Sequence, residues 1–185
     1  MKRDVVLSIQ GRQRYGEQEP ETIELVTEGT MEFRDGGWDI TYEESELTGL
    51  AGVVTTFRVE PEKVTLLRTG KLSSTMVFQE GVAHDSLYEM EFGALMITVK
   101  ATRLFYDIVE DGGCIDLVYH IVIEDTEAGE IDYHLDIRAI TWLAGHLKNR
   151  WRAGQGALLV VTHDRWFLDE VCQSMWEVHD GIVEP

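Results

Sequence analysis

The 185-residue sequence has little positive charge, few cysteines and no long apolar run. Its 16 Lys and Arg face 34 Asp and Glu, a net charge of −18, which argues against a nucleic-acid binder because phosphates are bound by clustered cations. No apolar run approaches the ~18 residues of a membrane-spanning helix, and the acidic, weakly apolar start does not fit a signal peptide. Only Cys114 and Cys172 are present, as is typical of a reducing cytosol. We therefore expect a cytoplasmic protein that contacts neither membrane nor nucleic acid.

Hydrophobic residues and charge are distributed unevenly along the chain. At 44% hydrophobic, the sequence is too apolar for a disordered acidic chain. Residues 1–139 hold 28 acidic and 12 basic residues, whereas residues 140–185 hold six and four. Four of the five tryptophans lie in this last segment. The shift predicts two domains that meet at residues 139 and 140.

Residues 1–139 show the pattern of a β domain. Apolar and polar residues alternate in many short runs, as in 38–42, which follow the turn signal Asp-Gly-Gly at 35–37. A second Asp-Gly-Gly turn is expected at 111–113. The pattern predicts a mainly β domain of about 8–10 antiparallel strands with turns every ~8–12 residues, closed into a barrel.

Several motifs of this β part agree in order and spacing with one family: Arg68-Thr69-Gly70, the segment MVFQEG at 76–81, His84 and the segment YEMEFG at 88–93. They resemble the YwiB-like family of small bacterial proteins, which is described as a calycin-like β-barrel of unknown function. The resemblance implies a calycin-like barrel over about 1–139 and says almost nothing about activity.

Residues 140–185 show a different periodicity. Apolar residues at 140, 143, 144 and 147 predict a helix. The unbroken apolar run 157–161 is typical of a strand buried on both faces. Asp164 is in the place of an N-cap for a second helix over 166–171, and alternation at 175–179 predicts a strand. We therefore expect a short α/β segment in the order helix, strand, helix, strand.

Three stretches of the second part carry a further resemblance. The segment VVTHDRWFLD at 160–169, the segment WEVHDG at 176–181 and His134-Leu135-Asp136 are similar to the switch-histidine loop, the following strand and turn, and the D-loop of ABC-F ATPases. The resemblance implies that His163 contacts a γ-phosphate and that Asp136 lies at a dimer seam. Because residues 133–140 fit both families, they suggest a chimera.

The parts that an ABC-F ATPase needs for hydrolysis are missing from the sequence. There is no G-x-x-x-x-G-K-[ST] phosphate loop and no Leu-Ser-Gly-Gly signature, and residues 127–133 do not match the magnesium-site strand. Phosphoryl transfer depends on positioning and electrostatic stabilisation of the phosphates. We therefore expect that the protein has no ATPase activity, is not an enzyme and binds no cofactor.

Other polar clusters favour ordinary structural roles. The six histidines lack zinc-ligand spacing, so we expect no metal site. The acidic run Glu43-Glu44-Ser45-Glu46 either binds a cation or forms a solvated loop, and we favour the loop. Cys114 follows Gly113 at a strand start and is expected to be a small packed residue.

One set of barrel residues suggests ligand contacts. Arg68, His84 and Tyr88 either line one barrel mouth as polar contacts to a small ligand, or Arg68 forms an ion pair with one of the many carboxylates.

Two classes of function follow from the sequence. The first is a non-enzymatic β-barrel that binds a small ligand. In the second, the ABC-F-like segment is a remnant ATP-binding module that acts with a partner nucleotide-binding domain, self-associates or binds another protein. A third interpretation is a fusion with no function of its own.

Overall fold

The computed structural model describes residues 2–16, 19–123, 126–150, 160, 165–174, 177–179 and 182–184. The chain divides into two units, Met1–Arg138 and Ala139–Pro185, which are described separately. This division lies one residue from the boundary that the sequence predicted. In the described part of the chain, no helix is long and apolar enough to cross a membrane.

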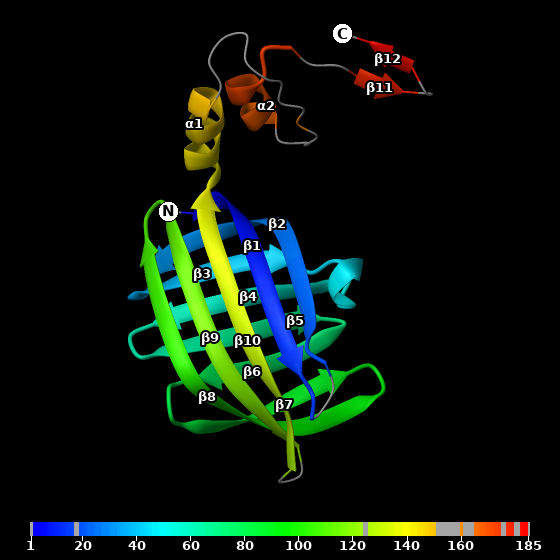
Figure 1. Cartoon of the computed structure of the whole chain (residues 1–185), viewed down its shortest axis with the longest axis vertical. Helices are drawn as coiled ribbons and strands as arrows, with labels where there is room; N and C mark the ends of the chain where they lie inside the picture. The colour runs from blue at the N-terminus through cyan, green and yellow to red at the C-terminus, as the bar shows by residue number, and fades with distance from the viewer. Residues whose placement is uncertain are drawn as a thin grey trace. The chain divides into compact units, whose positions relative to one another are not determined.

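The first unit is a closed barrel of ten strands that follow one another around the barrel in chain order, with β10 returning to β1 (Figure 1). Neighbouring strands pair antiparallel throughout β1–β10 wherever their register is described. The predicted antiparallel β-barrel is therefore confirmed. The strands are β1 (Lys2–Arg14), β2 (Glu21–Arg34), β3 (Gly37–Glu43), β4 (Val53–Glu60), β5 (Lys63–Gly70), β6 (Leu72–Phe78), β7 (Ala83–Met90), β8 (Gly93–Val109), β9 (Gly112–Ile123) and β10 (Thr126–Ala139).

The alternation of residue types explains which side chains fill the barrel. Successive strand residues point to opposite faces, so every second residue enters the lumen. On β1, Val5, Leu7 and Ile9 are buried, whereas Val6 and Ser8 between them are less buried. The inward residues of nine strands form one continuous core cluster, and Tyr88 of β7 packs against it. Its largest fully buried side chains include Phe57 on β4 and Phe78 on β6.

The two Asp-Gly-Gly segments have different roles. Between β2 and β3, Asp35 and Gly36 both have positive φ, 47° and 76°, as the predicted tight hairpin requires. Between β8 and β9, the chain turns at 110–111, and both glycines belong to β9. At Gly113 a Cβ atom would lie 2.0 Å from the carbonyl oxygen of Asp107. The second pair of glycines therefore allows a close approach of two strands, and the predicted turn is shifted by one residue.

The connection between β3 and β4 folds over one stretch of the inner wall. It contains a short 3-10 turn, η1 (Glu46–Thr48), which ends at Gly49 with φ 73°. The Glu44 amide donates a hydrogen bond to the Val53 carbonyl at 2.9 Å and so continues the β3–β4 pairing by one step. This pairing fixes the positions of Glu44 and Thr48.

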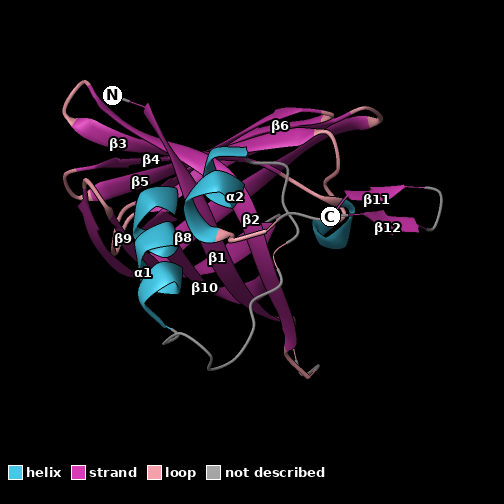
Figure 2. Cartoon of the chain, turned by 90° about the horizontal axis from the view of Figure 1, so that it is seen from above, coloured by secondary structure: helices cyan, strands magenta, loops and turns pink. Residues whose placement is uncertain are grey.

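The second unit contains helices α1 (Ile140–Arg150) and α2 (Arg165–Val171) and the antiparallel strands β11 (Glu177–His179) and β12 (Ile182–Glu184), drawn as a hairpin in Figure 2. Both predicted helices are confirmed. Lys148 of α1 forms an ion pair with Glu170 of α2, and Phe167 is buried. The predicted strand at 157–161 and the N-cap Asp164 lie outside the described residues, apart from Val160, which has no regular secondary structure.

Candidate ligand site in the barrel lumen

A row of polar side chains crosses the inner wall of five consecutive strands. The strand register places Tyr42 of β3 opposite Thr55 of β4, Thr55 opposite Arg68 of β5, Arg68 opposite Ser74 of β6, and Ser74 opposite Tyr88 of β7. All five belong to the inward set of their strands, because each lies two residues from a buried core residue. The register therefore concentrates polar groups at one level of an otherwise apolar lumen.

Glu44 supplies the negative charge of this level. Its side chain is only 2% exposed. The Oε1 atom accepts hydrogen bonds from the Tyr42 hydroxyl at 3.1 Å and from the Thr55 hydroxyl at 2.6 Å, and Oε2 accepts one from the Thr48 hydroxyl at 2.9 Å. Three hydroxyl donors thus stabilise the buried carboxylate.

Arg68 supplies the positive charge. Its Nε atom lies 3.9 Å from Glu44 Oε1, which is within ion-pair range but too far for a hydrogen bond. Nε is buried and has no hydrogen-bond partner among the described residues, and neither has the Ser74 hydroxyl. The guanidinium therefore compensates the charge of Glu44 while its N–H donors remain available.

The lumen beside these groups holds a cavity of about 120 Å³. An apolar cavity of about 150 Å³ is large enough to bind benzene, so this lumen has room for a small molecule. Arg68, Glu44 and Tyr133 contribute polar groups to its wall, and the rest of the wall is mainly apolar. The lining residues are Ile9, Gly11, Gln13, Ile23, Leu25, Tyr42, Glu44, Thr48, Leu50, Phe57, Leu66, Arg68, Phe78, Leu117, Tyr119, Ile131 and Tyr133.

Three tyrosines of the cavity wall are held in their neutral form. Burial raises the pKa of Tyr119 to about 12 and raises the pKa of Tyr42 and Tyr133 well above the usual value for a phenol. The negative charge of Glu44 further raises the pKa of Tyr42 and Tyr133, and the positive charge of Arg68 opposes the rise in all three. The three phenols therefore remain hydrogen-bond donors at neutral pH.

Arg68, His84 and Tyr88, which were predicted to line one barrel mouth, do not all lie together in the structure. Arg68 lines the cavity, and Tyr88 lies in the same cross-strand row but does not line the cavity. His84 is four residues away on β7, opposite Val99, and its buried Nε2 atom has no partner among the described residues. The structure thus brings Arg68 and Tyr88 to one level and leaves His84 at another. Arg68 forms the ion pair with a carboxylate that one alternative predicted, and its contact with a ligand stays a prediction.

Glu44 is the main residue that sequence reasoning missed. The run 43–46 was interpreted as a solvated loop, but Glu44 is buried within it, so that interpretation is wrong for this position. A signal was present, because the inward alternation Trp38, Ile40, Tyr42 continues to residue 44. The pattern of β3 therefore extends one step beyond the strand and carries a carboxylate into the lumen.

Of the two residues implied by the ABC-F resemblance, the structure describes Asp136, which does not line this cavity. Asp136 lies on β10 opposite Cys114, is partly exposed, and forms an ion pair with Arg138 at 3.0 Å. His163 lies outside the described residues. Within the described ranges, no group of three His, Cys, Asp or Glu side chains has an arrangement that could hold a metal ion.

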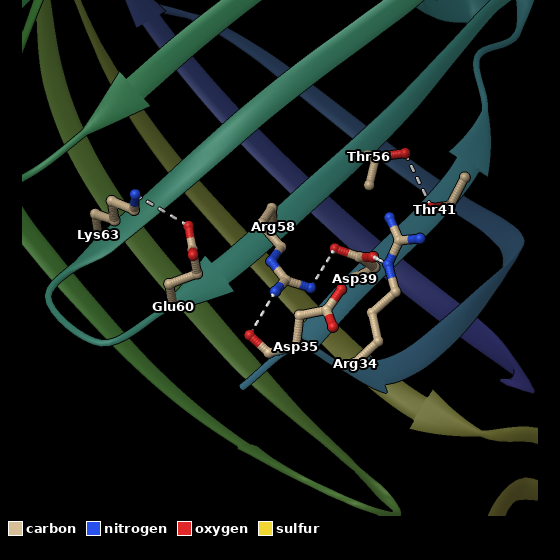
Figure 3. A network of polar contacts seen from close by, with 8 residues as sticks. All are labelled: Arg34, Asp35, Asp39, Thr41, Thr56, Arg58, Glu60 and Lys63. Atoms are coloured by element: carbon tan, nitrogen blue, oxygen red, sulfur yellow. Dashed lines mark hydrogen bonds and ion pairs between the residues drawn. The ribbon is translucent and has the colours of Figure 1, made fainter. Parts of the chain in front are cut away.

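The outer wall carries a second buried carboxylate. Asp39 of β3, 11% exposed, accepts hydrogen bonds from Arg34 and from Arg58 Nη1, the latter at 3.1 Å (Figure 3). Arg58 Nη2 also donates to the Asp35 carbonyl at 3.1 Å. The hydrogen bond and charge of Asp39 raise the pKa of Arg34. Every strong contact of Asp39 is thus made within the sheet and its β2–β3 turn.

A short part of the chain is similar in sequence to short segments of two much longer proteins. The energy-dependent translational throttle protein EttA of Mycobacterium tuberculosis is 42% identical over 52 residues, which are 28% of this chain and 9% of that protein. The ABC transporter F family member 4 of Arabidopsis thaliana is 47% identical over 47 residues, 25% of this chain and 6% of that protein. The chain thus spans less than a tenth of the length of these relatives.

The barrel has relatives over most of its length. The uncharacterised β-barrel protein YwiB of Bacillus subtilis is 26% identical over 125 residues, 68% of this chain and 83% of that protein. The crystal structure of YwiB superposes with a TM-score of 0.68 at 20% identity and covers 75% of this chain and 92% of that one, which shows a shared fold. The profile of the domain of unknown function DUF1934 matches residues 7–137. The chain therefore belongs to the DUF1934 family of YwiB-like β-barrels.

Proposed function

We propose that the calycin-like barrel of this protein binds a small, largely apolar ligand in its lumen and is not an enzyme. The observation that carries the proposal is the cavity of about 120 Å³ with a buried polar cluster on its wall. Barrels of about eight strands are either filled by side chains or hold a small ligand. Ligand pockets typically combine apolar walls with a few convergent polar groups, as this lumen does.

The state of Glu44 supports a binding role over catalysis. Its carboxylate already accepts three hydrogen bonds from neighbouring hydroxyls and faces the fixed charge of Arg68. A general base needs a free lone pair within reach of the substrate proton. Three of the about four lone-pair sites of the Glu44 carboxylate are occupied, so we expect this residue to hold the polar level in place.

A matched pair of variants tests the proposal. Leu66 lines the cavity, whereas its neighbour Leu67 points outward and is 40% exposed. Binding of 3-methylbutanol, 3-methylbutanamide and 3-methylbutanoate is measured by NMR titration of the full chain. At least one compound is expected to bind, Leu66→Phe to abolish its binding by filling the lumen, and Leu67→Phe to leave it unchanged. Absence of binding by all three, or equal effects of the two variants, would overturn the proposal.

We infer a second role from the short ABC-F matches. With 42% identity over 52 residues to EttA, the ABC-F-like segment is proposed to bind a partner nucleotide-binding domain, while the chain itself hydrolyses no ATP. The chain is expected to change the ATP turnover of an ABC-F ATPase, and His163→Ala to remove that effect. Unchanged turnover with the unaltered chain would exclude this role.

Two further expectations accompany these roles. We propose a cytoplasmic location, which the free thiols of Cys114 and Cys172 support. Self-association through the C-terminal unit is the alternative to a separate protein partner. Fractionation of cells and analytical ultracentrifugation of the full chain test the two expectations.

A further inference from the structure

The polar level of the lumen contains an arginine with a buried donor that is unpaired among the described residues. Its carboxylate, Glu44, already accepts hydrogen bonds from three hydroxyls. The guanidinium of Arg68 can only donate, and its buried Nε has no acceptor among the described residues. A buried donor without an acceptor costs free energy, so this level favours a ligand that supplies acceptor atoms.

Two hydroxyls belong to the same polar cluster. Ser74 lies directly opposite Arg68 on the neighbouring strand, and its buried Oγ has no partner in the described part of the chain. The Tyr133 hydroxyl comes from β10, lines the cavity and interacts with the Tyr42 hydroxyl. The Tyr133 ring contacts Phe57, at 5.5 Å between ring centroids. Arg68 and Tyr133 thus come from separate strands and border one cavity.

The charge balance restricts the acceptor group to a single negative charge. Among the described residues of the cavity wall, Arg68 is the one cation, and Glu44 at 3.9 Å partly compensates its charge. A dianion such as a phosphate monoester would bring two negative charges to a level that already contains Glu44, and like charges in a water-poor site repel strongly. A carboxylate carries one charge, and its two oxygens match the planar fork of an arginine.

We infer that the lumen binds a small monocarboxylate, with the carboxylate on Arg68 and Tyr133 and a short branched or cyclic tail in the apolar part of the cavity. The tail lies among Ile9, Leu25, Phe57 and Leu117. The volume of about 120 Å³ excludes long acyl chains from the enclosed space. This inference rests on the proposed ligand-binding function and specifies its ligand class.

The experiment compares 3-methylbutanoate with its neutral isostere 3-methylbutanamide by NMR titration of the full chain at pH 7. The acid is expected to bind about tenfold more tightly than the amide, because a charge-assisted pair is stronger than a neutral hydrogen bond. Arg68→Met is expected to weaken the acid about tenfold and to leave the amide within about threefold. Arg103→Met, at an exposed arginine of β8, serves as the matched control and is expected to change neither.

A second variant covers the case in which Arg68→Met does not fold. Tyr133→Phe removes only a hydroxyl and keeps the ring beside Phe57, so we expect about threefold weaker binding of the acid and unchanged binding of the amide. Equal affinities for acid and amide would overturn the carboxylate assignment and leave the ligand-binding proposal standing. Tighter binding of isobutyl phosphate than of the acid would overturn it too. Absence of binding by both isosteres would contradict both.

Discussion

Two carboxylates of the same chain segment are buried on opposite faces of the barrel wall and are satisfied in different ways. Asp39 on the outer face accepts hydrogen bonds from two arginines, one of which also binds the backbone of the β2–β3 turn. Glu44 on the inner face accepts hydrogen bonds from three hydroxyls, and its arginine stays at 3.9 Å. The outer cluster therefore uses the donors of its arginines within the protein, whereas the inner cluster leaves those of Arg68 available.

This difference distinguishes a structural polar cluster from the cluster that we propose binds a ligand. An arginine whose donors already bind a carboxylate of the protein stabilises the fold and has few donors left for a ligand. Arginine held near a carboxylate that other groups already satisfy keeps both its charge and its hydrogen-bonding capacity. Variants of the two clusters should therefore affect different properties of the protein.

The largest effect on stability is expected for Glu44→Gln. The change leaves the charge of Arg68 without compensation in the lumen, and breaking a buried ion pair in this way costs about 3 kcal/mol of the free energy of unfolding. Urea denaturation measures this cost. Glu46→Gln, at an exposed position of η1, is the control and should stay within about 0.5 kcal/mol. A cost at Glu44 as small as at Glu46 would show that the lumen tolerates an uncompensated Arg68.

The next effect is a loss of stability in alkali that originates in the lumen. The folded-state pKa of Tyr119, about 12, exceeds the unfolded value of 10.0. Below pH 10 the phenol is protonated in both states, and from pH 10 to 12 the unfolded state releases the proton first, so stability falls as pH rises. Between pH 9 and 11.5 this phenol should account for about 2 kcal/mol of the loss.

Tyr119→Phe isolates that contribution. The free energy of unfolding of the variant should decline less steeply above pH 10 than that of the unaltered chain. Parallel pH profiles for the unaltered chain and Tyr119→Phe would contradict the burial of this phenol.

A smaller effect is expected for Asp39→Asn on the outer wall. Losing the ion pairs to Arg34 and Arg58 at this partly exposed site should cost about 1 kcal/mol. The cost should shrink in 1 M salt, where the screening length is about 3 Å. Ligand binding should not change, because Asp39 does not line the cavity. Glu43→Gln, an exposed neighbour, is the control, and a loss of ligand affinity in Asp39→Asn would break the distinction between the clusters.

The smallest effect concerns a neutral pair of the outer wall. The hydroxyls of Thr41 and Thr56 lie 2.9 Å apart across β3 and β4 (Figure 3). A double-mutant cycle with Thr41→Val and Thr56→Val should give a coupling of about 0.5 kcal/mol. Strictly additive losses would show that this hydrogen bond contributes nothing beyond the separate side chains.

The barrel could be predicted because its information is local. Alternation of period two identifies each strand, and Asp35-Gly36 specifies a turn by itself through positive φ at two adjacent residues. The turn between β8 and β9 was misplaced by one residue, since the reason for Gly113 is a contact with the Asp107 backbone on the other strand. Local patterns therefore predict the strands, but contacts between strands decide their ends.

The site was predicted only in part, because it depends on register. Arg68 was identified as a ligand contact, but its neighbours Ser74 and Tyr133 come from strands whose alignment the sequence does not display. Glu44 was hidden in an acidic run that resembles a solvated loop. Which acidic residue of the run 43–46 is buried depends on which residues of β3 point inward. This alternation becomes clear only when Tyr42 is known to point inward.

Strand β10 constrains only every second residue of its sequence. Leu135 and Ile137 are fully buried, so the barrel dictates their character, whereas His134 and Asp136 face outward and are partly exposed. Of the motif shared with another family, His134 and Asp136 occupy outward positions, and Leu135 occupies an inward one that an apolar residue satisfies. The wall of a closed barrel thus leaves about half of its positions free to follow a second sequence pattern.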